Sequence, residues 1–146
     1  MPRWLIWSLV AIVLAVAGVW GGVTLYRQAT YGSRYAEQQG DVKVSVGDVF
    51  TLVVPDRGGS VGDDWTASIV DQAVASEERS ELVADSLKDR WFGAAPGGGG
   101  GDRLITFRAK APGTTQITLT NCYRGCNTQE NRAESRSVSW NVTVER

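Results

Sequence analysis

The sequence contains no histidine, and its 146 residues include only two cysteines and one methionine. The lack of histidine excludes a Ser-His-Asp or Cys-His catalytic site within this chain, and it excludes a zinc site with histidine ligands. Positive charge is not in surplus either, because 15 basic and 16 acidic side chains give a formal net charge of −1. We therefore expect no enzyme activity, no cofactor and no nucleic-acid partner.

Charged residues are missing altogether from positions 4–26, WLIWSLVAIVLAVAGVWGGVTLY. As a helix this segment spans about 30 Å of hydrocarbon. We predict that residues 1–26 form a transmembrane anchor. The alternative is a signal peptide cleaved near Ala17, which would leave a secreted protein. The apolar run continues past Ala17, and this favours the anchor. Aromatic residues, which prefer membrane interfaces, lie towards both ends of the segment: Trp4, Trp7, Trp20 and Tyr26.

The polar residues 27–40 are predicted to be a linker, and residues 41–146 a single domain. Apolar and polar residues alternate along several segments of this domain, as in half-buried strands. Gly- and Pro-containing turns separate them, so we predict an all-β, immunoglobulin-like antiparallel β-sandwich behind one N-terminal transmembrane helix. Residues 77–92 fit either a helix or an irregular strand or hairpin. The predicted strands are 42–46, 49–54, 65–70, 105–110, 116–120 and 137–145.

Three loops lie between these strands, at residues 55–64, 93–102 and 121–135. Alternate connections of a sandwich emerge at the same end, so the three loops are expected to form one recognition surface. Asp63 and Asp64 lack the regular spacing of a calcium loop. We interpret them as solvated turn residues and predict no metal site.

The two cysteines, Cys122 and Cys126, have the spacing C-x3-C, which is not that of a zinc or redox motif. We predict a local disulfide across Tyr123-Arg124-Gly125. Such a bond persists only in an oxidising compartment, so the domain is placed outside the cytoplasm. Two free thiols in a cytosolic domain are the alternative.

From about Asp41 onward the chain resembles the chagasin-type inhibitors of papain-like cysteine proteases. Residues 98–101 followed by 102–113, DRLITFRAKAPG, match the family's G-x-G-G loop, the next strand and the A-x-G turn. Val46-Gly47-Asp48 resembles its opening V-G-[DE]. Gly62 and Trp65 stand where the family has the last residue of N-P-T-T-G and the aromatic residue three positions later.

The resemblance implies an immunoglobulin-like fold whose three loops enter the cleft of a papain-like protease. Two of the three family motifs are altered in this chain. Gly59, Ser60 and Val61 replace Pro-Thr-Thr in the first loop, and the family's R-P-[WF] is absent from the third. There Tyr123 or Arg124 would supply the aromatic or cationic group. The predicted protease-binding residues are Gly59, Ser60, Val61, Gly62, Trp65, Gly98, Gly100, Gly101, Tyr123 and Arg124.

The sequence thus predicts a membrane-anchored or exported inhibitor of papain-like cysteine proteases. The alternative is a non-inhibitory, extracytoplasmic immunoglobulin-like module, such as an accessory subunit of a membrane complex. Gly18 and Gly22 stand four residues apart, with Ala15 one turn earlier. Small residues on one helix face allow close approach of a second membrane helix, and binding of a complex by this face would favour the alternative. Glycine and alanine are also simply common in membrane helices.

Overall fold

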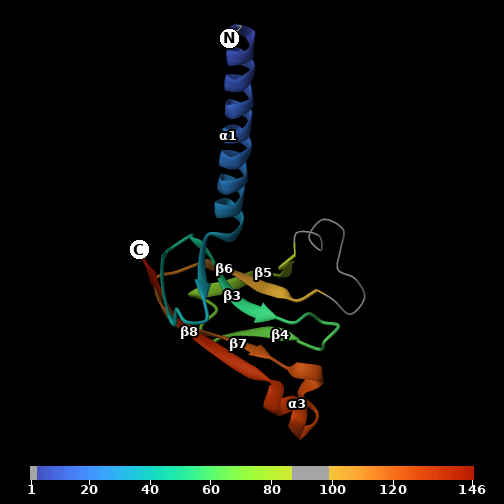
Figure 1. Cartoon of the computed structure of the whole chain (residues 1–146). Coiled ribbons are helices and arrows are strands. Elements are labelled where there is room, and N and C mark those ends of the chain that lie inside the picture. Colours follow the sequence, from blue (N-terminus) through green and yellow to red (C-terminus); the bar gives the residue numbers. More distant parts are fainter. Residues whose placement is uncertain (1–2, 87–98) are drawn as a thin grey trace.

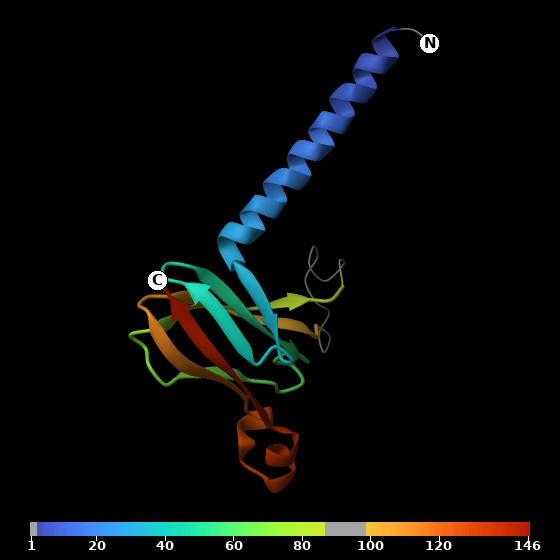
Figure 2. The ribbon, with the colours of Figure 1, turned by 90° about the vertical axis from the view of Figure 1, so that its left-hand side faces the viewer.

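The computed structural model describes residues 3–86 and 99–146, with side chains described in these ranges except at 3–11 and 27. A long helix, α1 (Arg3–Tyr31), precedes two sheets that each contain four strands within the described residues. Figure 1 shows α1 standing above the sandwich, and Figure 2 shows the same arrangement from the side. The prediction of a β-sandwich behind one N-terminal helix is confirmed.

The first sheet has the strand order β1-β3-β6-β5, and the second has the order β2-β8-β7-β4. Among the described strands, four neighbouring pairs are antiparallel, whereas β1 with β3 and β2 with β8 are parallel. The predicted antiparallel sandwich therefore also carries a parallel edge strand on each sheet, β1 and β2. The strands are β1 (Ser33–Ala36), β2 (Asp41–Ser45), β3 (Val49–Asp56), β4 (Trp65–Ile69), β5 (Ala75–Ala84), β6 (Gly101–Ala109), β7 (Gly113–Asn121) and β8 (Arg136–Glu145).

The core lies between the two sheets and consists of the inward-facing residues of the alternating strands. In β8, Trp140 and Val142 are fully buried, and the residues between and beside them face outward. Across the first sheet, the rings of Phe50 and Phe107 stack with centroids 5.6 Å apart. Burial of each such large apolar side chain contributes about 1.5–3 kcal/mol. The alternation seen in the sequence therefore builds the core directly.

Residues 75–84 form β5, which resolves the helix-or-strand alternative for the described part of 77–92; residues 87–92 lie outside the described residues. The strand pairs with β6, and its register shifts between Glu77 and Arg79. Such a bulge interrupts the alternation of side chains. This irregularity explains why the sequence pattern alone did not separate a helix from a strand here.

The predicted linker at 27–40 is largely ordered secondary structure. Helix α1 continues to Tyr31, Gly32 follows, and β1 begins at Ser33 and pairs with β3. A four-residue strand with polar composition has no recognisable hydrophobic period, because pairing with β3 and not burial of its side chains defines it. The sandwich therefore begins at Ser33 and not at Asp41.

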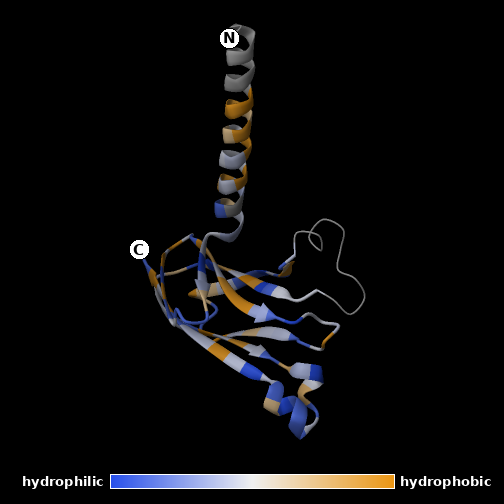
Figure 3. Cartoon of the chain, viewed as in Figure 1, coloured by the Kyte–Doolittle hydropathy of each residue, from blue (hydrophilic) through white to orange (hydrophobic). Residues whose placement is uncertain are grey.

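Within the described residues, one helix is long and apolar enough to cross a membrane. The candidate span is Ile12–Tyr31, with none of its window buried against the rest of the chain. Trp20 and Leu25 are each 73% exposed, and Figure 3 shows the apolar residues along the free part of α1. A membrane anchor and a signal sequence both satisfy this test.

Candidate functional site

The ends of six strands place three connections at one end of the sandwich. In the first sheet, Gly101 at the start of β6 pairs with Asp56 at the end of β3 and with Ala84 at the end of β5. In the second sheet, Asn121 at the end of β7 pairs with both Trp65 and Arg136. We call this the loop end. It comprises the β3–β4 loop (57–64), the described residues 85–86 and 99–100 of the β5–β6 connection, and the β7–β8 loop (122–135).

The β3–β4 and β7–β8 loops are joined by hydrogen bonds from Arg124, one from its backbone and one from its side chain. The N–H of Arg124 donates to the carbonyl oxygen of Gly62 over 2.8 Å, and Arg124 Nε donates to the carbonyl oxygen of Val61 over 3.3 Å. Gly62 has a φ of +108°, and a Cβ there would lie 2.6 Å from Arg124 Cγ. Only glycine adopts this conformation without strain and still permits the approach. The first and third loops therefore form one continuous surface.

Beneath this surface, hydrogen bonds to Asp63 stabilise the base of the β3–β4 loop. Its carboxylate accepts hydrogen bonds from the backbone N–H of Arg57 at 2.8 Å, from Arg57 Nη2 at 2.8 Å and from Asn121 Nδ2 at 2.9 Å. Only 2% of the Asp63 side chain is exposed. An isolated buried carboxylate would be costly, but this one is paired and fully hydrogen-bonded.

The charge of Asp63 is stabilised strongly by these partners. Burial alone raises the pKa of Asp63, but the hydrogen bonds from Arg57 and Asn121 and the positive charge of Arg57 outweigh it. The pKa is held at about 2, below the ordinary value of 3.8. The same pair raises the pKa of Arg57 further above its usual range. Both groups are therefore charged at any physiological pH.

Arg57 also reaches the third loop. Its guanidinium lies 4.7 Å from the ring centroid of Tyr123, and its Nη1 lies 3.4 Å from a carboxylate oxygen of Glu134. The guanidinium of Arg124 lies 5.2 Å from the centroid of the same ring. Cation–π contacts at partly exposed sites contribute about 0.5–1 kcal/mol each. Tyr123 is thus held by two arginines, one from each loop.

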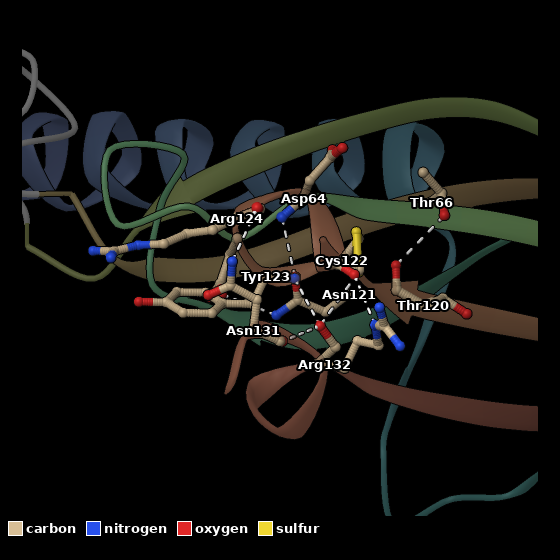
Figure 4. The surroundings of a disulfide bond; sticks show 12 residues. Asp64, Thr66, Thr120, Asn121, Cys122, Tyr123, Arg124, Asn131 and Arg132 are labelled. Atoms are coloured by element: carbon tan, nitrogen blue, oxygen red, sulfur yellow. Dashed lines mark hydrogen bonds between the residues drawn. A yellow bond between two sulfur atoms is a disulfide. The ribbon is translucent and has the colours of Figure 1, made fainter. Parts of the chain in front are cut away.

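A disulfide closes the start of the third loop. Cys122 and Cys126 are bonded, with Cα atoms 5.3 Å apart, around the short 3-10 turn η1 (Tyr123–Cys126) (Figure 4). Within the ring, Arg124 and Cys126 adopt positive φ values of 46° and 53°. Left-handed conformations cost non-glycine residues about 1 kcal/mol or more each, so the surroundings must impose them. The predicted disulfide is present in the structure.

The rest of the third loop supports this ring. Helix α3 (Gln129–Glu134) begins at the N-cap Thr128, whose hydroxyl accepts from the N–H of Asn131 at 3.1 Å. Asn131 Nδ2 then donates to the carbonyl oxygen of Arg124 at 3.4 Å, and Arg132 Nε donates to that of Cys126 at 3.1 Å. Figure 4 shows Asn131 and Arg132 beside the disulfide. These two side chains supply hydrogen-bond donors to the carbonyl groups of the left-handed residues Arg124 and Cys126.

The comparison with protein families decides what this sandwich is. Residues 43–144 match the family described as Chagasin family peptidase inhibitor I42. The chain belongs to the chagasin family. Members of this family are inhibitors and not enzymes, in agreement with the expectation from the missing catalytic residues. No curated protein matches the chain.

Solved structures with the same fold include two of particular relevance. The solution structure of amebosin has a TM-score of 0.57 and 20% sequence identity, covering 77% of this chain and 97% of amebosin. The crystal structure of the cysteine protease inhibitor EhICP2 from Entamoeba histolytica has a TM-score of 0.57 and 16% identity, covering 77% of this chain and 94% of EhICP2. At such identities the similarity concerns the fold.

The chagasin-family domain brings most of the predicted contact residues to the loop end. Gly59, Ser60 and Arg124 are exposed there, while Val61, Gly62, Tyr123 and Gly100 are partly exposed. Gly98 lies outside the described residues. Two predicted contact residues are positioned differently, since Gly101 is buried at the start of β6 and Trp65 is only 7% exposed.

Trp65 supports the loops from below. Its ring belongs to the buried core, and the Arg136 guanidinium lies 5.1 Å from the ring centroid on one side. The indole therefore presents too little surface to contact a partner directly. The interpretation of Trp65 as a surface contact is replaced by one in which it packs beneath the β3–β4 and β7–β8 loops.

The pairing of Arg57 with Asp63 was not predicted from the sequence. Asp63 was interpreted as a solvated turn residue, whereas its side chain is almost fully buried. The neighbouring Asp64 is exposed, and the described residues contain no group of three metal-ligating side chains. An arginine six residues before an aspartate within one loop was the available signal, but many solvated loops show the same pattern.

Proposed function

We propose that the loop end inhibits a papain-like cysteine protease by filling its active-site cleft. The joined β3–β4 and β7–β8 loops carry this proposal, because the hydrogen bond from Arg124 to Gly62 makes them one preorganised surface. Preorganisation lowers the entropic cost of binding. The mechanism is steric: exposed Gly59 and Ser60 enter the cleft, and Tyr123 and Arg124 contact its rim. No covalent step is required.

Family membership supports inhibition of a peptidase, and the lack of histidine agrees with a protein that blocks chemistry without performing it. The loop sequence differs from the family motif at Gly59, Ser60 and Val61. These residues are small, so the tip of the loop remains narrow enough to enter a cleft. Recognition then depends on the backbone shape of the β3–β4 loop more than on its side chains.

The test is a titration of papain with the full-length chain in detergent micelles, following hydrolysis of a peptide substrate. Inhibition is expected at micromolar concentration or below, with competition between inhibitor and substrate. Ser60→Trp enlarges the exposed tip and should abolish inhibition. The matched control is Gln72→Trp, because Gln72 is also exposed but lies on the β4–β5 connection at the opposite end. Equal inhibition by both variants would contradict a role for the loop end.

We also propose that α1 remains attached as a membrane anchor, with the domain outside the cytoplasm. Cleavage near Ala17 would leave a helical stub with Trp20 and Leu25 each 73% exposed. Exposed apolar side chains in such a row require lipid or another cover. The Cys122–Cys126 disulfide supports an oxidising compartment.

The anchor is tested by intact mass and by alkaline extraction of membranes from expressing cells. The uncleaved chain should stay in the membrane pellet with its complete N-terminal mass. A soluble product that lacks the first residues up to Ala17 would show that the segment is a cleaved signal peptide and not an anchor. Labelling of the domain by a membrane-impermeant reagent on intact cells should succeed if the domain lies outside.

A further inference from the structure

The junction between α1 and the sandwich consists of a single residue. Gly32 alone separates the last residue of the helix, Tyr31, from the first residue of β1, Ser33. The N–H of Gly32 donates to the carbonyl oxygen of Gln28 at 2.9 Å, and its φ is +56°, as at a helix end closed by a left-handed residue. A Cβ at Gly32 would lie 1.6 Å from the carbonyl oxygen of Val49. The helix end is thus pressed against β3.

Tyr31 fixes the helix end to the outer face of the first sheet. Its carbonyl oxygen accepts a 2.7 Å hydrogen bond from the hydroxyl of Thr51 on β3, and its own hydroxyl donates to a carboxylate oxygen of Glu81 on β5. The guanidinium groups of Arg34 and Arg79 lie 4.9 Å and 5.7 Å from its ring centroid. Tyr31 therefore contacts three strands, β1, β3 and β5.

The far end of β1 is fixed to the second sheet. The indole Nε1 of Trp140 donates to the carbonyl oxygen of Ala36 at 3.2 Å, and Arg136 pairs with Glu37 at 2.7 Å. Trp140 is fully buried in the core. With β1 paired to β3 along its length, the segment from the helix end to Glu37 is held at both ends and along its middle.

We propose that this junction holds the loop end at one height and in one direction above the membrane, so that the partner is a papain-like protease held at the same membrane. In Figure 1 the strands run across the axis of α1, and Figures 1 and 2 both place the β7–β8 loop with α3 at the end of the domain farthest from the helix. A rigid connection restricts encounter to targets at a matching height, whereas a flexible one samples many heights. This inference rests on the proposed inhibitory function and specifies where its target is.

The test uses the full chain in phosphatidylcholine vesicles, with papain attached to the outer leaflet. Gly/Ser tethers of roughly 5, 20 and 60 residues give papain r.m.s. reaches of about 12, 25 and 43 Å. For the native chain, we expect the inhibition of papain to depend on the tether length. The ratio of inhibition at the most favourable length to that at the least favourable length should be about ten. An insertion of about 12 Gly/Ser residues between Tyr31 and Gly32 should reduce this ratio to about threefold or less. The same insertion after Arg146 is the matched control and should leave the ratio unchanged.

A second pair of variants changes single residues. Gly32→Ala places a Cβ against the Val49 carbonyl and should behave like the insertion, whereas Gly40→Ala meets nothing within 4 Å and should behave like the native chain. Equal dependence on tether length in the native chain and the insertion variant would overturn the proposal.

A measurement without protease separates this proposal from the inhibitory function. A fluorophore introduced at exposed Gln72 reports the tumbling of the domain in nanodiscs by time-resolved anisotropy. The native chain should tumble with the disc, and the insertion variant should add a segmental motion on the nanosecond timescale. Segmental motion in the native chain would overturn the rigid junction even if papain is inhibited. Failure to inhibit papain in micelles, with a rigid junction, would instead reject the proposed function and with it the membrane-held target, while the rigid junction itself would stand.

Discussion

The backbone N–H of Arg124 lies 2.8 Å from the carbonyl oxygen of Gly62, a residue 62 positions earlier in the chain. This hydrogen bond joins two loops. The contact exists because Gly62 adopts a φ of +108° and leaves room for the Arg124 side chain. The Cys122 N–H also donates to the carbonyl oxygen of Asp64 at 2.8 Å, and Arg57 contacts Tyr123, so the two loops form one surface. The conformation of Gly62 is the feature on which the preorganisation of the loop end depends.

Gly62→Ala should weaken inhibition by at least about tenfold, corresponding to about 1.4 kcal/mol. The added Cβ meets Arg124 Cγ at 2.6 Å, and alanine is strained at this φ. Gly59→Ala is the matched control in the same loop, since a Cβ at Gly59 meets nothing within 4 Å. Inhibition constants of both variants, with circular dichroism to verify folding, provide the measurement. Similar constants for Gly62→Ala and the native chain would show that the joined loops do not determine binding.

Arg57→Ala should lower the free energy of unfolding by more than the loss of an exposed ion pair does, because it leaves the buried carboxylate of Asp63 without its charged partner. Chemical denaturation measures this change. Arg108→Ala provides a comparison, since Arg108 pairs with Glu78 at an exposed site where an ion pair stabilises the fold little. If the two variants lose the same free energy, Asp63 does not depend on Arg57.

Much of the sandwich could be predicted from sequence because alternation reports directly which residues face the core. The clearest case is β8, where Trp140, Val142 and Val144 are all buried. The parallel strand β1 could not be predicted, since its four residues are defined by pairing with β3 and by the left-handed Gly32 before it. Only the tertiary structure supplies these partners.

The candidate site could likewise be predicted from the sequence only in part. The positions of the three loops follow from the order of the strands, and the disulfide follows from the spacing of Cys122 and Cys126. The burial of Asp63 and Trp65 beneath the loops does not follow, because adjacent positions such as Asp64 and Thr66 are exposed. Whether a polar residue in a loop faces solvent or the interior depends on the path of the backbone, which the loop sequence alone does not define.

Acid should destabilise the domain through Asp63. Because the pKa of Asp63 is lowered to about 2 in the folded state, its contribution to stability is fully present above the unfolded value near 3.8. The contribution, about 2 kcal/mol, is lost as the pH falls from about 4 through about 2. Unfolding free energies measured by denaturation across this range should fall more steeply for the native chain than for Asp63→Asn. Parallel slopes for the two proteins would contradict the assigned pKa.

Reduction of the Cys122–Cys126 disulfide should loosen the third loop and leave the sandwich folded. A cross-link that closes so short a loop contributes about 2 kcal/mol in the chain-entropy description. Without it, nothing covalent maintains the left-handed conformations of Arg124 and Cys126, and the contact of Arg124 with Gly62 should be lost. Amide hydrogen exchange should therefore rise at residues 122–126 and at 61–62, while β8 remains protected.

Cys122→Ser with Cys126→Ser should reproduce the effect of reduction and lower inhibition by about tenfold or more. The oxidised native chain should weigh about 2 Da less than its reduced form, the mass of the two hydrogens lost on forming the bond. Unchanged exchange at 61–62 in the double variant would show that the third loop holds its shape without the disulfide. The contact between Arg124 and Gly62 would then be maintained by α3 and the Asn131 hydrogen bond alone.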